Sequence, residues 1–123
     1  MITLPGEGGP RWLNRLVEEL HAFAALNIGG IANVTILPAG FETVFGFDTG
    51  PGNTLLDAWI QSRRGLRFDS DGAWSARGRP AQSLLEALLA DPYFRSPPPK
   101  STGFEYFNLE WLQRGIAAAG RQE

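Results

Sequence analysis

The pattern of apolar and polar residues predicts one helix, then three short strands, then more helices. From Pro10 to about residue 25, apolar side chains recur at helical spacing, which is typical of an amphipathic helix. Two apolar runs then flank Gly29 and Gly30, and a glycine pair between such runs predicts a β-hairpin. Residues 43–48 are rich in β-branched and aromatic side chains and predict a third strand.

Three helices are expected after these strands, over residues 54–64, 80–90 and 108–119, with Gly65 as the stop of the first. The proline-rich segment 96–103 is interpreted as an internal loop, with a docking peptide as the alternative. The order of elements indicates an α/β fold built from a β-hairpin and a third strand followed by helices. The apolar positions expected to face inward are Leu55, Leu56, Trp59, Ile60, Leu84, Leu85, Leu88, Leu89, Leu109, Trp111, Leu112 and Ile116.

Composition narrows the class of protein. The 123 residues suit one domain with a real hydrophobic core. A net charge of -2 with 43% hydrophobic residues argues against disorder and against a basic surface for nucleic acid. The absence of cysteine excludes disulfides, thiolate metal sites and a cysteine nucleophile. No apolar run approaches a membrane span or a signal peptide, so a soluble, cytoplasmic protein is expected.

The candidate chemistry centres on Asp48, at the expected end of the third strand. Gly50, Pro51 and Gly52 follow it and are expected to end the strand and to let backbone amides approach a ligand. Asn53 or the next residue is expected to cap the following helix. A carboxylate beside a glycine turn and a helix start is a common place for chemistry in α/β proteins. The alternative is an Asx-turn, in which Asp48 binds only its own neighbouring amides.

Two further polar residues, Asn27 and Asn33, interrupt the apolar strands on either side of the Gly29–Gly30 turn. A buried amide side chain without a partner would cost about 1–3 kcal/mol, so partners are expected for both. One interpretation is a pair of structural asparagines bonded to nearby loops. The other is a hairpin whose glycine amides hold phosphate oxygens. His21 is the only histidine, and a structural or exposed role is expected for it.

Six stretches in a fixed order carry a resemblance to one bacterial family. They are LNIGGIANVT at residues 26–35, GFDTGPGN at 46–53, LDAW at 56–59, DGAW at 71–74, and DPYF at 91–94 with PPKSTG at 98–103. Together they closely resemble anhydro-N-acetylmuramic acid kinases. That resemblance implies the duplicated, ribonuclease H-like fold of sugar kinases and actin-like ATPases.

The resemblance also implies a reaction and roles for residues. ATP would phosphorylate O6 of 1,6-anhydro-N-acetylmuramic acid while water opens the anhydro ring, in cell-wall recycling. Asp48 falls on the catalytic aspartate of the family, a general base toward water. Gly29 and Gly30 fall on a hairpin that contacts the β- and γ-phosphates of ATP. Mg²⁺ would bridge these phosphates, and no residue of this chain is expected to bind the metal directly. The sugar pocket would include Gly50, Gly52 and Asn53, and Asn27 and Asn33 would line the cleft.

The resemblance runs from about Ala25 to about Leu112. It implies that residues 25–123 are part of the second lobe of such a kinase, and residues 1–24 are a poorly matched lead-in and helix. Family members are considerably longer, and the motifs of the first phosphate loop and of the adenosine site are not found in this sequence. Phe104 stands where an arginine often follows the Ser-Thr-Gly motif. A non-catalytic remnant or interaction module of the same fold is therefore the alternative function. A homodimer of the longer enzyme is one of the assemblies left open.

Overall fold

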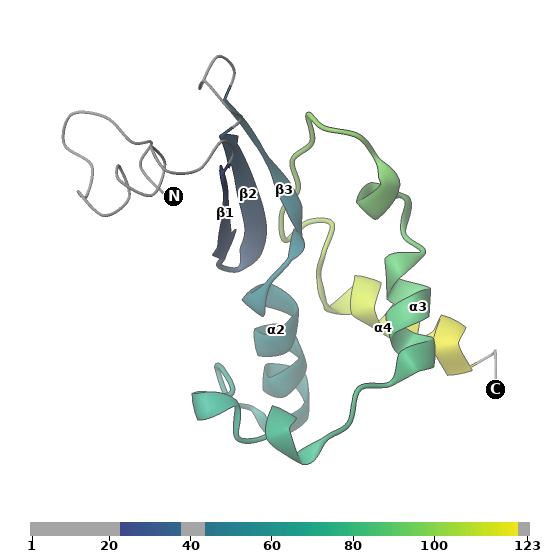
Figure 1. The fold of residues 1–123 in the computed structure, drawn as a ribbon. Coiled ribbons are helices and arrows are strands. Elements are labelled where there is room, and N and C mark those ends of the chain that lie inside the picture. The colour runs from purple at the N-terminus through teal and green to yellow at the C-terminus, as the bar shows by residue number, and fades with distance from the viewer. Residues whose placement is uncertain (1–22, 38–43, 121–123) are drawn as a thin grey trace.

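The computed structural model describes residues 23–37 and 44–120, which form a three-stranded antiparallel sheet followed by helices. In Figure 1 the strands lie at one end of the molecule, and helices α3 and α4 lie beside each other away from the sheet. The α/β class and the hairpin with a third strand are confirmed. The elements are β1 (Phe23–Ile28), β2 (Ile31–Leu37), β3 (Phe45–Pro51), α2 (Asn53–Arg64), η2 (Ser70–Gly72), η3 (Ser75–Arg77), α3 (Gln82–Leu89), η4 (Pro92–Arg95) and α4 (Leu109–Gly120).

The register of the sheet aligns chemically similar residues into rows. Asn27 lies opposite Asn33, which lies opposite Asp48 on the other side. Directly opposed residues in an antiparallel pair project from the same face, so these three polar residues share one face. In the next row Leu26 lies opposite Val34, and both side chains project from the other face of the sheet. The sheet therefore has a row of polar residues on the face of Asp48, and apolar residues on the opposite face.

Strand β3 continues past Asp48 to Pro51, so the expected end of the strand at Asp48 is wrong. Gly50 pairs with Ala32 and Pro51 with Ile31, after an irregularity in the pairing next to Asn33. Within the described residues β3 pairs only with β2, and a proline is tolerated on an edge strand because its missing N–H is not needed there. The irregularity is a β-bulge, in which β3 has one residue more than β2, and β3 then leads into α2.

Helix α2 begins without the expected side-chain cap. Its N-cap residue is Gly52, and no side chain of Asn53 or Thr54 caps it. The first turn of this helix contains no acidic residue that could interact with the helix dipole. The expected stop at Gly65 is confirmed, because Gly65 has a φ of 68° and its N–H binds the carbonyl of Gln61.

The core lies between the helices and the end of the sheet. Phe107 is fully buried and contacts the Trp111 and Leu112 cluster of α4, against which Leu55 and Trp59 of α2 pack. Ile60 is also buried. Four of the positions expected to face inward are instead exposed, because α2, α3 and α4 bury only a narrow stripe of each helix. These are Leu56, Leu85, Leu89 and Ile116.

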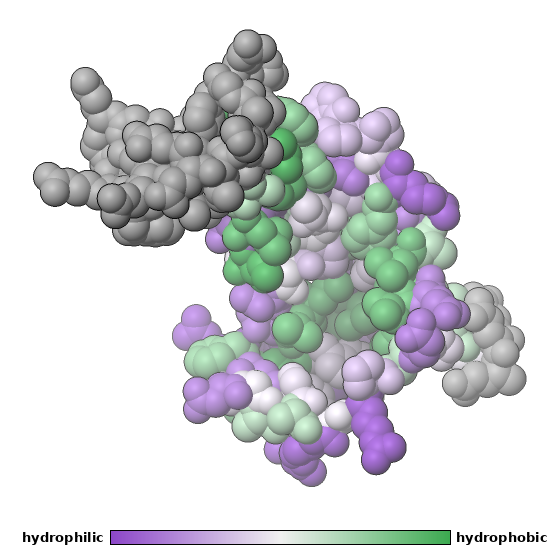
Figure 2. All heavy atoms as spheres, in the orientation of Figure 1, coloured by the Kyte–Doolittle hydropathy of each residue, from purple (hydrophilic) through white to green (hydrophobic). Residues whose placement is uncertain are grey.

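Hydrophobic side chains also remain on the surface of the sheet. Leu26 and Ile28 of β1 are 58% and 61% exposed, and Phe45 of β3 is 45% exposed. Figure 2 shows hydrophobic residues gathered over the strands. The apolar face of the sheet is therefore incompletely covered by the described residues.

Several expectations fall outside the described residues. Most of the helix expected from Pro10 lies there, as does His21. The expected end of that helix at residue 25 is wrong, because Phe23, Ala24 and Ala25 pair with β2 as a strand. None of the helices in the described part of the chain has the length and hydropathy needed to cross a membrane.

Candidate functional site

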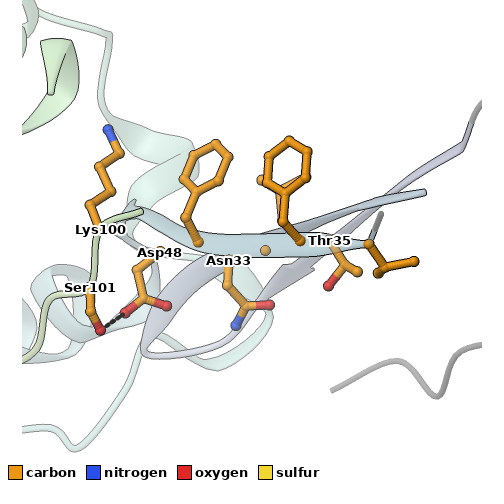
Figure 3. Close-up of a pocket in the computed structure, with 10 residues that line it drawn as sticks. Asn33, Thr35, Asp48, Lys100 and Ser101 are labelled. Atoms are coloured by element: carbon orange, nitrogen blue, oxygen red, sulfur yellow. Dashed lines mark hydrogen bonds between the residues drawn. The ribbon is translucent and has the colours of Figure 1, made fainter. Parts of the chain in front are cut away.

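The carboxylate of Asp48 is held by a loop that is distant in the sequence. Its Oδ2 accepts a hydrogen bond of 2.9 Å from the backbone N–H of Thr102. The same oxygen accepts one of 3.3 Å from the Ser101 hydroxyl, which Figure 3 shows. No hydrogen bond to Oδ1 occurs within residues 23–37 and 44–120. The Asx-turn interpretation of Asp48 is wrong, because the partners lie on the 96–103 loop. The same bonds confirm that this proline-rich segment is an internal loop.

The backbone of Asp48 is fixed as well. Its N–H donates to the carbonyl of Lys100 at 3.3 Å, and its carbonyl accepts a hydrogen bond of 2.6 Å from the Tyr93 hydroxyl. In Figure 1 the loop that follows η4 runs back beside β3, which is what these bonds require. Both the main chain and the carboxylate of Asp48 are thus set by residues 93–102.

Tyr93 and Lys100 are also joined to each other. Lys100 Nζ donates to the Tyr93 carbonyl at 2.9 Å and lies 4.7 Å from the centre of the Tyr93 ring. The same ammonium lies 5.6 Å from the ring centre of Phe47, the residue before Asp48. Burial, and then the nearby Asp48 carboxylate, raise the pKa of Tyr93, so its hydroxyl remains a donor at neutral pH.

Asp91 anchors the short helix η4 that carries Tyr93. Its Oδ1 accepts from the Tyr93 N–H at 2.8 Å, and its Oδ2 accepts from Trp111 Nε1 at 2.8 Å. The Tyr106 hydroxyl donates to the same carboxylate. Desolvation acts to raise the pKa of Asp91, but these hydrogen bonds and the charge of Arg114 outweigh it and the pKa is lowered. Asp91, which follows α3, is therefore an anchoring point for the segment that holds Asp48.

Asn27 and Asn33 lie in the same row as Asp48, as the cleft interpretation requires. Both are half-buried, and within residues 23–37 and 44–120 neither side chain has a hydrogen-bond partner. The expected partners are therefore not found there, and partial exposure to water removes the cost of lacking them. Figure 3 shows Asn33 and Asp48 pointing to the same side of the sheet.

An open depression of about 650 Å³ follows β3 beside this row. Its polar lining comes from three elements: Asn33 and Thr35 of β2, Asp48 of β3, and Lys100 and Ser101 of the loop (Figure 3). A cavity of this size suits a small molecule, and its amide, hydroxyl and carboxylate groups suit a polar ligand such as a sugar. The Lys100 ammonium points to the other side of the sheet, where it binds the Tyr93 carbonyl.

The glycine hairpin is joined directly to the start of α2. The N–H of Asn53 donates to the Gly29 carbonyl at 2.8 Å, and the N–H groups of Gly52 and Thr54 donate to the Gly30 carbonyl at 2.9 and 3.1 Å. These bonds satisfy donors that a helix start leaves unpaired, which explains why no side-chain cap is needed. The hairpin and the Asp48 strand are therefore held together through the first turn of α2.

Two of the predicted pocket glycines are required for packing. A Cβ at Gly52 would overlap the carbonyl oxygen of Gly29. Gly50 is buried with a φ of 152°, and a Cβ there would lie 2.7 Å from the Phe94 ring. Neither glycine lines the depression beside Asp48, whereas Asn53 lines a second one with Asp57 and Arg67.

Sequence reasoning assigned no role to Tyr93, Lys100, Ser101 or Thr102. The signal was present, because all four lie in the last two stretches of the family resemblance. A loop can be predicted from its prolines, but which strand it contacts depends on how the helices between them fold.

A family model described as anhydro-N-acetylmuramic acid kinase matches residues 13–123. The chain belongs to this family. The match begins inside the segment 1–24 and continues through every element described above. The site built around Asp48 is thus a site of an anhydro-N-acetylmuramic acid kinase family member.

Curated relatives give the same family. An anhydro-N-acetylmuramic acid kinase of Coxiella burnetii (strain Dugway 5J108-111) is 48% identical over 125 residues, which covers 94% of this chain and 32% of the relative. One from Shewanella baltica (strain OS223) is 50% identical with the same coverage. One from Shewanella sediminis is 49% identical over 128 residues, covering 97% of this chain and 33% of the relative. The chain spans about a third of the length of these relatives.

Proposed function

We propose that this chain carries the general base of an anhydro-N-acetylmuramic acid kinase, and that this base is Asp48. The observation that supports the proposal is the one-sided anchoring of the carboxylate. Oδ2 is occupied by Thr102 and Ser101, whereas Oδ1 has no partner in the described residues, and Asp48 lines the depression. A carboxylate held by one oxygen can accept a proton with the other.

The proposed reaction is the phosphorylation of 1,6-anhydro-N-acetylmuramic acid by ATP with hydrolytic ring opening. Asp48 takes a proton from a water molecule as the water oxygen bonds to the anomeric carbon. The bond from that carbon to the bridging oxygen breaks, and its electron pair stays on O6. O6 attacks the γ-phosphorus of ATP, and ADP leaves. The products are N-acetylmuramic acid 6-phosphate and ADP.

We propose that backbone amides of the hairpin at Gly29 and Gly30 contact the phosphates of ATP. Magnesium would supply charge neutralisation between the β- and γ-phosphates. Among the described residues no three His, Cys, Asp or Glu side chains are grouped to hold a metal ion. The bonds from α2 to the Gly29 and Gly30 carbonyls support the proposal, because they would keep the hairpin at a fixed distance from Asp48.

For the sugar we propose contacts to the row of Asn27 and Asn33, whose amide groups have no protein partner among the described residues. We also propose the sugar pocket at Gly50, Gly52 and Asn53. The two glycines would act there by close backbone packing rather than by lining the depression.

The wider assignment follows from the same family. We propose that residues 25–123 are part of the second lobe of a ribonuclease H-like, actin- and sugar-kinase-type fold, in an enzyme of peptidoglycan recycling in the bacterial cytoplasm. A homodimer of the longer enzyme is part of this proposal. The alternative, a non-catalytic interaction module, is favoured by one observation, the exposed apolar face at Leu26, Ile28 and Phe45.

The test uses a grafted protein, in which residues 13–123 replace the matching third of the Shewanella baltica relative. ADP release with the anhydro sugar is measured for the graft, for Asp48→Asn and for Asp71→Asn. Asp48→Asn should lower turnover by about 100-fold or more and leave thermal unfolding unchanged. Asp71 is an exposed control with a φ of 56°, a conformation that asparagine also tolerates.

Undiminished turnover in Asp48→Asn would remove the assignment of the base. Phosphorylation of the anhydro sugar by the 123-residue chain alone would exclude the interaction module. Competition between the anhydro sugar and other sugars in the same assay would separate this kinase from one that acts on a different sugar.

A further inference from the structure

We propose that Tyr93 is a positioning residue for Asp48, so that turnover depends on its hydroxyl while substrate affinity does not. This inference rests on the proposed function of Asp48 as a base. Tyr93 does not line the depression beside Asp48. Its effect would therefore act through the placement of Asp48.

The hydroxyl of Tyr93 reaches the backbone of the reacting residue itself. It donates to the Asp48 carbonyl over 2.6 Å, a shorter bond than those that Asp48 makes to residues 100–102. The Tyr93 ring cannot move freely, because its centre lies 5.4 Å from that of the fully buried Phe107, with Phe94 and Tyr106 at 6.2 Å. The Tyr93 hydroxyl is thus held in place by the aromatic residues of the core, whereas the Asp48 carbonyl that it binds lies at the edge of the sheet.

Tyr93 also controls the second anchor of Asp48. Its carbonyl accepts from Lys100 Nζ at 2.9 Å, and the residues after Lys100 supply the two donors to the Asp48 carboxylate. One residue is therefore bonded both to the strand that carries the carboxylate and to the loop that orients it. A shift of either by about 1 Å is enough to cost a large part of a catalytic rate.

The position of Tyr93 is in turn set from the helices. Asp91 binds the Tyr93 N–H and Trp111 Nε1, each at 2.8 Å. Trp111 belongs to α4, so the chain of contacts runs from the helical core to the sheet edge. This explains why a short 3-10 helix, η4, stands between α3 and the loop.

The test compares two variants that each lose a single phenolic oxygen, in the grafted protein. Tyr93→Phe removes the bond to Asp48 and keeps the ring packing. We expect kcat to fall about 3- to 10-fold, the equivalent of one net hydrogen bond, with KM for the sugar and for ATP unchanged. Tyr106→Phe removes a bond to Asp91, which keeps its other two donors. We expect kcat within about twofold of the parent for this control.

A second measurement does not depend on activity. Hydrogen exchange of a peptide covering residues 96–103 reports mainly on Lys100 to Gly103, because residues 97–99 are prolines and have no amide. Exchange should be faster in Tyr93→Phe than in the parent, and unchanged in Tyr106→Phe, because the Thr102 N–H donates to the carboxylate of Asp48, whose carbonyl loses its Tyr93 partner. The bond from Lys100 to the Tyr93 carbonyl is kept in this variant. Faster exchange confirms that the Tyr93 hydroxyl holds Asp48 in place and, through Asp48, orders the loop.

Three results would overturn the proposal: an unchanged kcat in Tyr93→Phe, an equal fall of kcat in both variants, or a change of KM alone. If the parent graft has no turnover, the proposed function fails on that result. The exchange experiment then tests the positioning role of Tyr93 without any activity, and unchanged exchange in Tyr93→Phe overturns that role.

Discussion

The backbone N–H of Thr102 donates a hydrogen bond of 2.9 Å to Asp48 Oδ2, across 54 residues of sequence. The Ser101 hydroxyl reaches the same oxygen at 3.3 Å. The shorter bond comes from the main chain, and a substitution of either side chain leaves that donor in place. The orientation of the Asp48 carboxylate is therefore a property of the loop backbone.

Ser101→Ala should have a small effect on turnover for this reason. We expect less than about a 10-fold loss of kcat in the grafted protein, since one weak, exposed hydrogen bond is removed. Thr102→Ser keeps the backbone donor and serves as the control, with kcat unchanged. A loss in Ser101→Ala as deep as in Asp48→Asn would mean that the serine hydroxyl acts directly on the substrate.

Asn33→Ala should weaken sugar binding without destabilising the protein. Its side chain has no partner within the described residues, so its removal leaves no buried group unpaired there. We expect KM for the anhydro sugar to rise by about 5-fold or more, the equivalent of one hydrogen bond to the ligand, with the unfolding midpoint unchanged.

Asn108→Ala is the matched control for that experiment. The Asn108 side chain binds the carbonyl of Glu105 at 3.2 Å and accepts from the Trp111 N–H at 3.0 Å at the start of α4. Its loss should cost about 1 kcal/mol of unfolding free energy, as for a lost helix cap, and leave KM unchanged. The opposite pattern, with Asn33→Ala destabilising, would assign Asn33 a structural role.

Gly52→Ala should destabilise the fold and loosen the hairpin. The new Cβ would overlap the Gly29 carbonyl oxygen, a backbone atom that cannot rotate away. We expect a loss of about 1–3 kcal/mol in the free energy of unfolding, the range for overpacking. Gly78→Ala is the control, because the nearest atom to its Cβ is the Ser75 oxygen at an ordinary 3.6 Å. Equal stability of the two variants would contradict the close contact at Gly52.

Asp91 should make the stability of the chain depend on pH. Its pKa in the folded state is lowered from the usual 3.8, so the folded chain binds fewer protons than the unfolded chain near that pH. Its contribution is complete above the usual pKa and is lost as the pH falls through the folded value. Urea unfolding between pH 6 and pH 2 should therefore show a stability difference between the parent and Asp91→Asn that shrinks at low pH. A constant difference would contradict this linkage.

Local patterns were sufficient for most elements. The glycine pair predicted the hairpin, Gly65 predicted the end of α2, and the prolines predicted the loop before Gly103, since each depends on the conformation of a few adjacent residues. The residues where prediction failed involve pairing with another segment. Strand β3 continues to Pro51 because β2 offers it a partner, and Ala25 lies in a strand and not in a helix for the same reason.

Helical periodicity also overestimated what is buried. It places Leu56 with Leu55 on one face of α2, and Leu85 and Leu89 with Leu88 in α3. A helix buries only the part of that face that another element covers, and Leu56, Leu85 and Leu89 are exposed. The periodicity of one helix does not show how much of its apolar face the neighbouring elements cover.

The sequence by itself determined the order of hairpin, strand and helices and singled out Asp48 as a candidate for chemistry, because these depend on residue type and local spacing. Its motifs determined the family, and the resemblance to that family implied the role of Asp48 as a base. Only the tertiary structure decided what surrounds Asp48. The loop at residues 100–102, Tyr93 and Asn33 reach it from separate elements, and each contact depends on how those elements pack. Contacts of this kind are selected by the folding of the whole chain, whereas turns and caps are selected within a few residues.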